Sequence, residues 1–217
     1  MQTTICQLKT PTAQEVRHQS NNLSKSYTLL APIYDLFVNR ASKAMRAASL
    51  ATLPTRPGMV LLAGVGTGLD LPHLPAHHRY VGVDLTGAML RRSLPRTGRL
   101  DFRPVQGDVH RLPFADASFD AVVAHLILAV VPQPALCLAE ISRVLKPGGE
   151  ALILDKFLRR QQKAPLRRLL NPLARRIATR FDVVFEDLLD ASPGLALRDD
   201  SPVLAGGWFR RIRLVRR

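Results

Sequence analysis

The sequence predicts an α/β protein built on a doubly wound, mostly parallel seven-stranded sheet with an antiparallel last strand. Short apolar runs typical of buried strands alternate with helix-periodic segments over residues 59–155, and two further strand candidates lie near the C-terminus. The chain has 217 residues, of which 47% are hydrophobic, and this suits one domain with a full core. We therefore expect a flexible N-terminal arm over residues 1–25 and a single domain over 26–217.

The individual elements follow from periodicity and turn residues in chain order. Apolar residues recur every three or four positions in residues 26–53, which indicates one or two amphipathic helices forming a helical lid. We then expect a strand at 59–63, a helix around 69–76, a strand at Tyr80–Val83, a helix at 86–94, strands at Leu100–Gln106 and Phe119–Ala124, a helix at 134–145, a strand at Glu150–Asp155, a helix-rich basic stretch at 160–190, and strands at Leu195–Arg198 and Trp208–Val215. The last two are joined across Gly206-Gly207 like a hairpin, which predicts one antiparallel strand.

Composition narrows the compartment and the kind of site. Apolar runs such as Val122–Val131 are much shorter than the roughly 20 residues of a membrane-spanning helix, and the N-terminus lacks the order of a secretory signal. We therefore expect a cytoplasmic protein. Cys6 and Cys137 lie far apart without a partner at metal-ligand spacing, so we expect neither a disulfide framework nor a metal site.

Basic residues are in excess, with 31 Lys and Arg against 17 Asp and Glu and a formal net charge of +14. Much of the excess lies in residues 156–180, which we call the basic tract and which contain no acid. Three interpretations stay open: a solvated Arg-rich surface, an anionic membrane surface, or nucleic acid. If the tract binds an anionic membrane surface, we expect the protein to attach peripherally to the inner face of the membrane.

A glycine-rich loop, Gly64-Val65-Gly66-Thr67-Gly68, directly follows the first predicted strand. Glycines at such a position let the backbone turn tightly and let a ligand approach it closely. A dinucleotide fingerprint requires a further glycine where this chain has Leu69, so the NAD pattern fits imperfectly. Alone, the loop indicates either a nucleotide site or a structural turn.

Two acids end the next two predicted strands. Asp84 comes 18 residues after Gly66, where a carboxylate can accept hydrogen bonds from both hydroxyls of a ribose; a helix N-cap is the alternative role. Asp108, in Gln106-Gly107-Asp108-Val109, could accept from an adenine amino group, with turn formation as the alternative. Together with the loop, the acids favour a nucleoside-containing ligand.

From about Leu29 to Asp155 these features resemble the motif series of class I S-adenosylmethionine (SAM)-dependent methyltransferases of the type 11 kind. The segments Leu112-Pro113-Phe114, Ser118-Phe119-Asp120 and Lys146-Pro147-Gly148-Gly149 also match that family. The resemblance implies a Rossmann-like fold, an enzyme that transfers methyl groups, and SAM as cofactor. It implies cofactor-binding roles for Ala63, Gly64, Gly66, Gly68, Asp84, Leu85, Met89, Asp108, Val109 and His125.

One position departs from the family pattern. Leu62-Ala63 stand where the family often has an acid that helps hold the SAM amino group. The backbone carbonyls of Ala63 and Gly64 are the expected substitutes.

The acceptor side carries three candidate catalytic residues, Tyr27, Tyr34 and His125. Tyr27 and the string Ala31-Pro32-Ile33-Tyr34-Asp35 resemble the helical lid of phospholipid N-methyltransferases and of ubiquinone/menaquinone C-methyltransferases, although ordinary helix packing would also explain the tyrosines. His125 begins a segment ending in Val130-Val131-Pro132 that resembles the same phospholipid enzymes. Its imidazole could orient the acceptor or take a proton, or it could be a structural histidine.

The functional prediction is therefore methyl transfer to a hydrophobic or lipid-like acceptor, with a phosphatidylethanolamine-type amine ahead of a quinone. Arginines interleaved with leucines in the basic tract support an anionic membrane surface as partner. The alternative is an RNA-directed or other small-molecule methyltransferase. A SAM-binding protein without catalysis is the third possibility, and the resemblance leaves the oligomeric state open.

Overall fold

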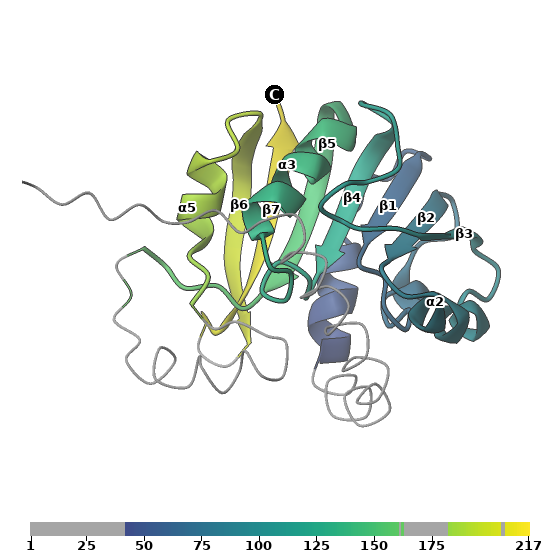
Figure 1. Cartoon of the computed structure of the whole chain (residues 1–217). Coiled ribbons are helices and arrows are strands. Elements are labelled where there is room, and N and C mark those ends of the chain that lie inside the picture. Colours follow the sequence, from purple (N-terminus) through teal and green to yellow (C-terminus); the bar gives the residue numbers. More distant parts are fainter. Residues whose placement is uncertain (1–41, 161, 163–181, 205–206) are drawn as a thin grey trace, which may run out of the picture.

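The computed structural model describes residues 42–160, 162, 182–204 and 207–217 (Figure 1). The expected N-terminal arm, the first part of the expected lid with Tyr27 and Tyr34, and most of the basic tract lie outside these residues. No helix within the described ranges combines the length and the apolar character needed to cross a membrane.

A seven-stranded sheet forms the centre of the molecule, in the order β3-β2-β1-β4-β5-β7-β6. The strands are β1 (Met59–Ala63), β2 (Arg79–Asp84), β3 (Asp101–Gln106), β4 (Phe119–His125), β5 (Leu145–Asp155), β6 (Leu195–Leu204) and β7 (Phe209–Arg216). The first five pair in parallel, whereas β7 pairs antiparallel with both β5 and β6. The predicted fold class, including the antiparallel last strand, is confirmed.

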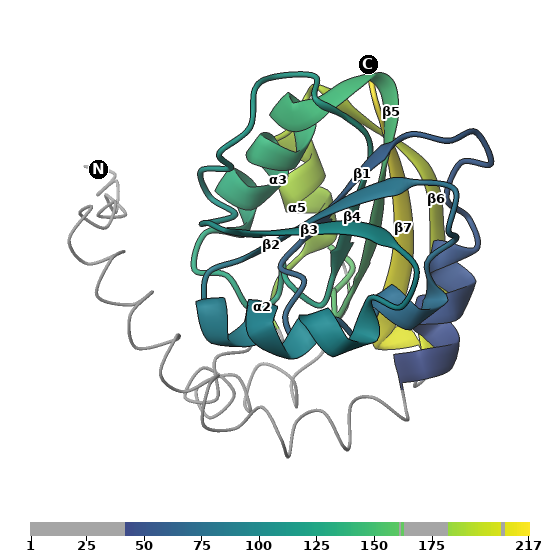
Figure 2. The same ribbon diagram turned by 90° about the vertical axis from the view of Figure 1, so that its right-hand side faces the viewer.

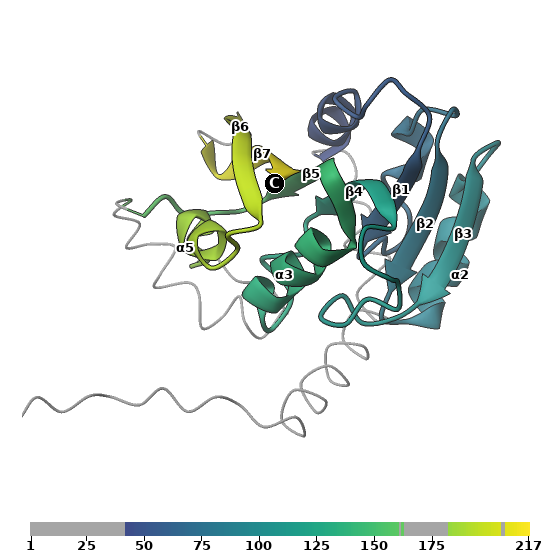
Figure 3. The same ribbon diagram turned by 90° about the horizontal axis from the view of Figure 1, so that it is seen from above.

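Helices cover both faces of the sheet, as expected for strands that are apolar on both sides. The first face packs against α3 (Pro134–Val144) and α5 (Phe185–Asp190). The second packs against the helix over residues 42–50, the 3-10 helix η1 (Leu71–His73) and α2 (Gly87–Ser93). Figure 3 shows α3 and α5 on one side of the sheet and the helix over residues 42–50 on the other. In Figures 1 and 2, α2 lies near the carboxyl ends of the parallel strands, at the end of the molecule away from the C-terminus.

The predicted helix around 69–76 is wrong. Only η1 forms there, because Pro72 fits the first turn of a helix but Pro75 lacks an N–H and would clash with the preceding turn. The predicted strand ending at Arg198 instead continues to Leu204, since acidic residues of β6 face arginines of β7: Asp199 lies opposite Arg213 in the register. β5 begins at Leu145, five residues before the predicted Glu150, and of the helix-rich stretch expected at 160–190 the described residues contain α5. The other described boundaries agree with the prediction to within three residues.

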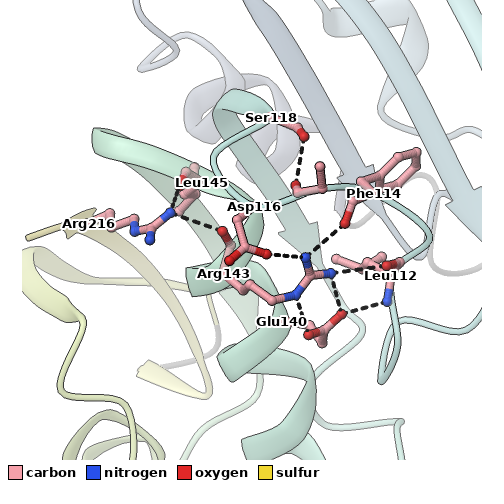
Figure 4. A network of polar contacts seen from close by, with 9 residues as sticks. Leu112, Phe114, Asp116, Ser118, Glu140, Arg143, Leu145 and Arg216 are labelled. Atoms are coloured by element: carbon pink, nitrogen blue, oxygen red, sulfur yellow. Dashed lines mark hydrogen bonds and ion pairs between the residues drawn. The ribbon is translucent and has the colours of Figure 1, made fainter.

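The loop between β3 and β4 has little regular structure and is fixed by one side chain of α3, Arg143 (Figure 4). Its guanidinium donates to the carbonyl oxygens of Phe114 (2.8 Å) and Leu112 (3.1 Å) and to Asp116 Oδ1 (2.7 Å). Glu140, one turn earlier on α3, accepts from Arg143 Nε at 2.7 Å and from the Leu112 N–H at 2.7 Å. The loop that follows Asp108 is therefore held to α3 by charged groups that satisfy its backbone.

Candidate active site

The glycine-rich loop leaves β1 and crosses above the carboxyl end of β2. Its three glycines have positive φ angles, 72° at Gly64, 55° at Gly66 and 80° at Gly68. The Val65 N–H donates to the Val83 carbonyl at 2.8 Å, which ties the loop to β2. A Cβ added to Gly66 would meet no atom within 4 Å, so this backbone faces open space. The loop is thus a cradle into which a ligand can come close to the main chain.

Asp84, the last residue of β2, holds this loop in place. Its Oδ2 accepts from the Gly66 N–H at 2.9 Å, and its Oδ1 accepts from the Thr86 N–H at 3.0 Å. The N-cap of α2 is Thr86 and not Asp84, because Thr86 Oγ1 accepts from the Met89 N–H at 3.3 Å. Burial raises the pKa of Asp84, while the N–H donors oppose that shift. The carboxylate therefore stands beside the cradle, where additional hydroxyl donors would favour its charged form.

Asp108 lies next to Asp84 along the same edge, since the Gly107 N–H donates to the Asp84 carbonyl at 3.0 Å. The Gln133 N–H donates to His110 Nε2 at 3.4 Å, so we assign the ring proton to His110 Nδ1. That Nδ1 lies 2.7 Å from Asp108 Oδ1 and lowers the pKa of the acid. The His110 N–H also donates to Asp108 Oδ1, at 2.9 Å, so both contacts of the carboxylate use Oδ1. The Asp108 side chain keeps 39% of its surface exposed. Asp108 is thus a charged acceptor at the rim of the cradle.

His125, the last residue of β4, is buried in a polar cluster under the loop. Its side chain has 0% exposure. Nδ1 lies 2.9 Å from Asp70 Oδ1, and Nε2 lies 3.0 Å from Ser49 Oγ. Asp70 Oδ1 also accepts from Arg46 Nη1 at 2.8 Å, and Arg46 Nε donates to Ser42 Oγ at 3.1 Å. The cluster joins the helix over residues 42–50, the end of the glycine loop and the end of β4.

Comparison with known proteins identifies the family. A family model described as a methyltransferase domain matches residues 61–153. A phosphatidylethanolamine N-methyltransferase of Cereibacter sphaeroides is 35% identical over 202 residues, which cover 90% of this chain and 98% of that protein. The chain belongs to the class I SAM-dependent methyltransferases.

Other relatives agree with this assignment. A demethylmenaquinone methyltransferase of Renibacterium salmoninarum is 30% identical over 141 residues, which cover 65% of this chain and 58% of that protein. The 1,6-didemethyltoxoflavin-N1-methyltransferase of Burkholderia thailandensis, solved with bound S-adenosylhomocysteine, shares the fold at 19% identity, with a TM-score of 0.72 and coverage of 96% and 93% of the two chains. The protein is an enzyme, and its cofactor is SAM.

The described residues of the methyltransferase fit this cofactor. Gly66 leaves room beside the main chain, Asp84 offers a carboxylate at the position expected for the ribose, and Asp108 offers one for the base. Leu85, between them, is 39% exposed and presents an apolar surface suited to one face of an adenine ring. Met89 and Val109, also predicted to bind the cofactor, are buried in the core beneath. The structure brings the predicted residues to one edge, while their direct contacts with SAM stay a prediction.

Four residues of the buried cluster were missed by the sequence interpretation: Ser42, Arg46, Ser49 and Asp70. A signal was present, because Ser42, Arg46 and Ser49 recur at helical spacing among alanines and leucines. The same segment was interpreted from its apolar residues alone. The sequence places Asp70 only within the helix expected around 69–76, and its partners Arg46 and His125 are 24 and 55 residues away.

The described members of the basic tract are largely engaged with acids. Arg160 binds Asp187 at 2.9 Å and also Asp190, and Arg159 lies 3.4 Å from Asp200. These arginines are exposed, so the ion pairs add little stability, yet they reduce the positive charge offered by this part of the tract. Any polyanion-binding role therefore depends on the residues of the tract that lie outside the described ranges.

Proposed function

We propose that this methyltransferase transfers a methyl group from SAM to a lipid-like acceptor, with a phosphatidylethanolamine-type amine preferred over a quinone. The observation that carries the proposal is the 35% identity to a phosphatidylethanolamine N-methyltransferase across 98% of that protein's length. The similarity to a demethylmenaquinone methyltransferase, by contrast, spans 58% of the relative. Regions outside the shared SAM core usually determine the acceptor, so coverage of the whole relative favours the amine.

The segment that leaves β4 supports an apolar acceptor. Leu126, Ile127 and Val130 are half-buried apolar side chains beyond the end of the strand, and Leu126 has a positive φ of 58° that redirects the chain there. Asp155, buried at the end of β5, accepts from the Ala129 N–H at 2.9 Å and holds the segment from behind. A wall of this kind suits the hydrocarbon part of a lipid.

When bound, SAM supplies a methyl group activated on a sulfonium. That methyl group would go to the lone pair of a neutral acceptor nitrogen, with the thioether of S-adenosylhomocysteine as the leaving group. The described residues contribute orientation and exclusion of water, through the glycine cradle, Asp84 and the apolar β4 exit. Tyr27 and Tyr34 remain proposed to cover the reacting groups, and His125 to act on the acceptor side. For His125 a direct proton transfer would require release of Ser49 or Asp70, since both ring nitrogens are engaged.

The test is transfer of labelled methyl from SAM to separate samples of phosphatidylethanolamine vesicles, a demethylated quinone in detergent, and RNA. We expect label in the phosphatidylethanolamine and none in vesicles whose amine has been acylated, because acylation removes the nucleophile and keeps the lipid. Label in the quinone alone would refute the preference for an amine. Label in RNA alone would refute the lipid proposal as a whole.

Peripheral membrane binding is a separate part of the proposal. We expect the basic tract, through Arg167, Arg168, Arg175 and Arg176, to bind anionic bilayers with about 1 kcal/mol from each basic residue at the surface. Sedimentation with anionic and with neutral vesicles should show binding to the anionic ones that salt weakens. Equal binding to both would exclude this role of the tract.

A further inference from the structure

The first strand supplies no acid to the amino-acid end of the cofactor. Leu62 and Ala63 are both buried apolar residues, packed in the cores on opposite faces of the sheet. The methionine part of SAM carries an ammonium and a carboxylate, and charges removed from water need partners. Groups elsewhere in the chain must therefore neutralise this zwitterion.

Asp70 brings a carboxylate to the sheet face on which Leu62 lies. Leu62 pairs with Val123 of β4, and His125, two residues further, projects to the same face as Val123 because side chains alternate along a strand. His125 Nδ1 holds Asp70 Oδ1 at 2.9 Å. Asp70 thus lies beside the ends of β1 and β4, two residues after the last glycine of the loop.

The buried pair of Arg46 and Asp70 retains one available charged atom on each side chain. Asp70 uses Oδ1 for both of its contacts, and Arg46 uses Nε and Nη1. Among the described residues, Asp70 Oδ2 and Arg46 Nη2 have no hydrogen-bond partner, and neither is a fully buried atom. The two side chains keep 10% and 8% of their surface. Burial alone would raise the pKa of Asp70, but His125 and Arg46 outweigh it and hold that pKa well below its ordinary value, so the carboxylate is charged.

We propose that Asp70 and Arg46 bind the amino-acid end of SAM, with Asp70 Oδ2 accepting from the ammonium and Arg46 Nη2 donating to the carboxylate. One negative and one positive group, already paired and oriented, match a zwitterion better than they match a cation or an anion alone. In this arrangement His125 is a positioning residue, because it fixes the rotamer of Asp70, and this role is the alternative to a direct one on the acceptor side. The acid missing from β1 is replaced by one that reaches the same face from the end of the loop.

The experiment measures calorimetric affinities for three nucleosides: S-adenosylhomocysteine, its deaminated analogue and its decarboxylated analogue. Asp70→Asn should weaken binding of S-adenosylhomocysteine by about tenfold to a hundredfold and leave the affinity for the deaminated analogue unchanged. Arg46→Gln should likewise weaken binding of S-adenosylhomocysteine and leave the affinity for the decarboxylated analogue unchanged. Each variant thus loses affinity only for ligands that carry the group bound by the side chain that was replaced.

Asp200→Asn is the matched control, because Asp200 binds Arg210 at 2.7 Å with similar burial, at 13% side-chain exposure, on the distant strand β6. It should lower thermal stability without changing any of the three affinities. If Asp70→Asn weakens binding of S-adenosylhomocysteine and of the deaminated analogue by the same factor, the role of Asp70 is structural and the proposal is wrong. Unchanged affinity for S-adenosylhomocysteine would also overturn it.

Discussion

Alanine at Gly66 should separate cofactor binding from folding. Gly66 has a φ of 55°, and an added Cβ meets nothing within 4 Å, so the penalty in the free protein is conformational. A side chain in the left-handed region costs roughly 1–2 kcal/mol. In the complex the same methyl group would stand where the ligand approaches the main chain, and overfilling a packed site costs about 1–3 kcal/mol. We therefore expect Gly66→Ala to fold and to bind S-adenosylhomocysteine about tenfold to a hundredfold more weakly.

Gly98 provides a matched control in the turn before β3. Its φ is 54°, and an added Cβ there also meets nothing within 4 Å, so Gly98→Ala should lose a similar free energy of unfolding. Urea denaturation measures that loss for both variants, and calorimetric titration measures the affinity for S-adenosylhomocysteine. If Gly66→Ala binds the nucleoside as tightly as Gly98→Ala does, the open space at Gly66 is not the cofactor site.

Three further predictions concern Asp84 and His125 beside the glycine loop and Arg143 beneath the loop between β3 and β4. Because burial raises the pKa of Asp84 and ribose hydroxyls bind its charged form, affinity for S-adenosylhomocysteine should fall as pH drops through that pKa; titrations between about pH 4 and 7 should show this fall in the wild type and a weak, flat profile in Asp84→Asn. Arg143→Leu should lower the free energy of unfolding by about 2–3 kcal/mol in urea, since two carbonyls and Glu140 lose a charged donor, whereas loss of the exposed Asp116 pair in Asp116→Asn should cost below about 1 kcal/mol. His125→Asn should weaken cofactor binding together with turnover, because Asp70 loses its support; a fall in kcat with unchanged affinity would instead favour a direct role on the acceptor.

The fold was predictable because it depends on local signals. The apolar run of β1 and the glycine loop after it are each recognisable from a few consecutive residues. The parallel pairing of the strands follows from the helices that separate them in sequence. The failures arose where one residue outweighs a pattern. Pro75 prevents the helix expected around 69–76, and the arginines of β7 extend β6 through acids that lie beyond the predicted end of that strand at Arg198. Both errors concern polar or proline residues whose effect depends on a partner or on backbone geometry.

The candidate site divides along the same line. Asp84 and Asp108 were predictable because Asp84 ends β2 and Asp108 follows the end of β3 by two residues, and the carboxyl ends of neighbouring parallel strands meet at the same side of a sheet. Arg46, Asp70 and His125 come from a helix, a loop and a strand, and only packing against the second face of the sheet brings them within hydrogen-bond distance. An acid at the end of β1 and an acid after the loop are unrelated in sequence, yet Asp70 contacts His125 at the end of β4, the strand that pairs with β1. When a strand lacks the acid that a motif expects, the neighbouring residues in the fold should therefore be searched for another acid. In this chain that acid is Asp70.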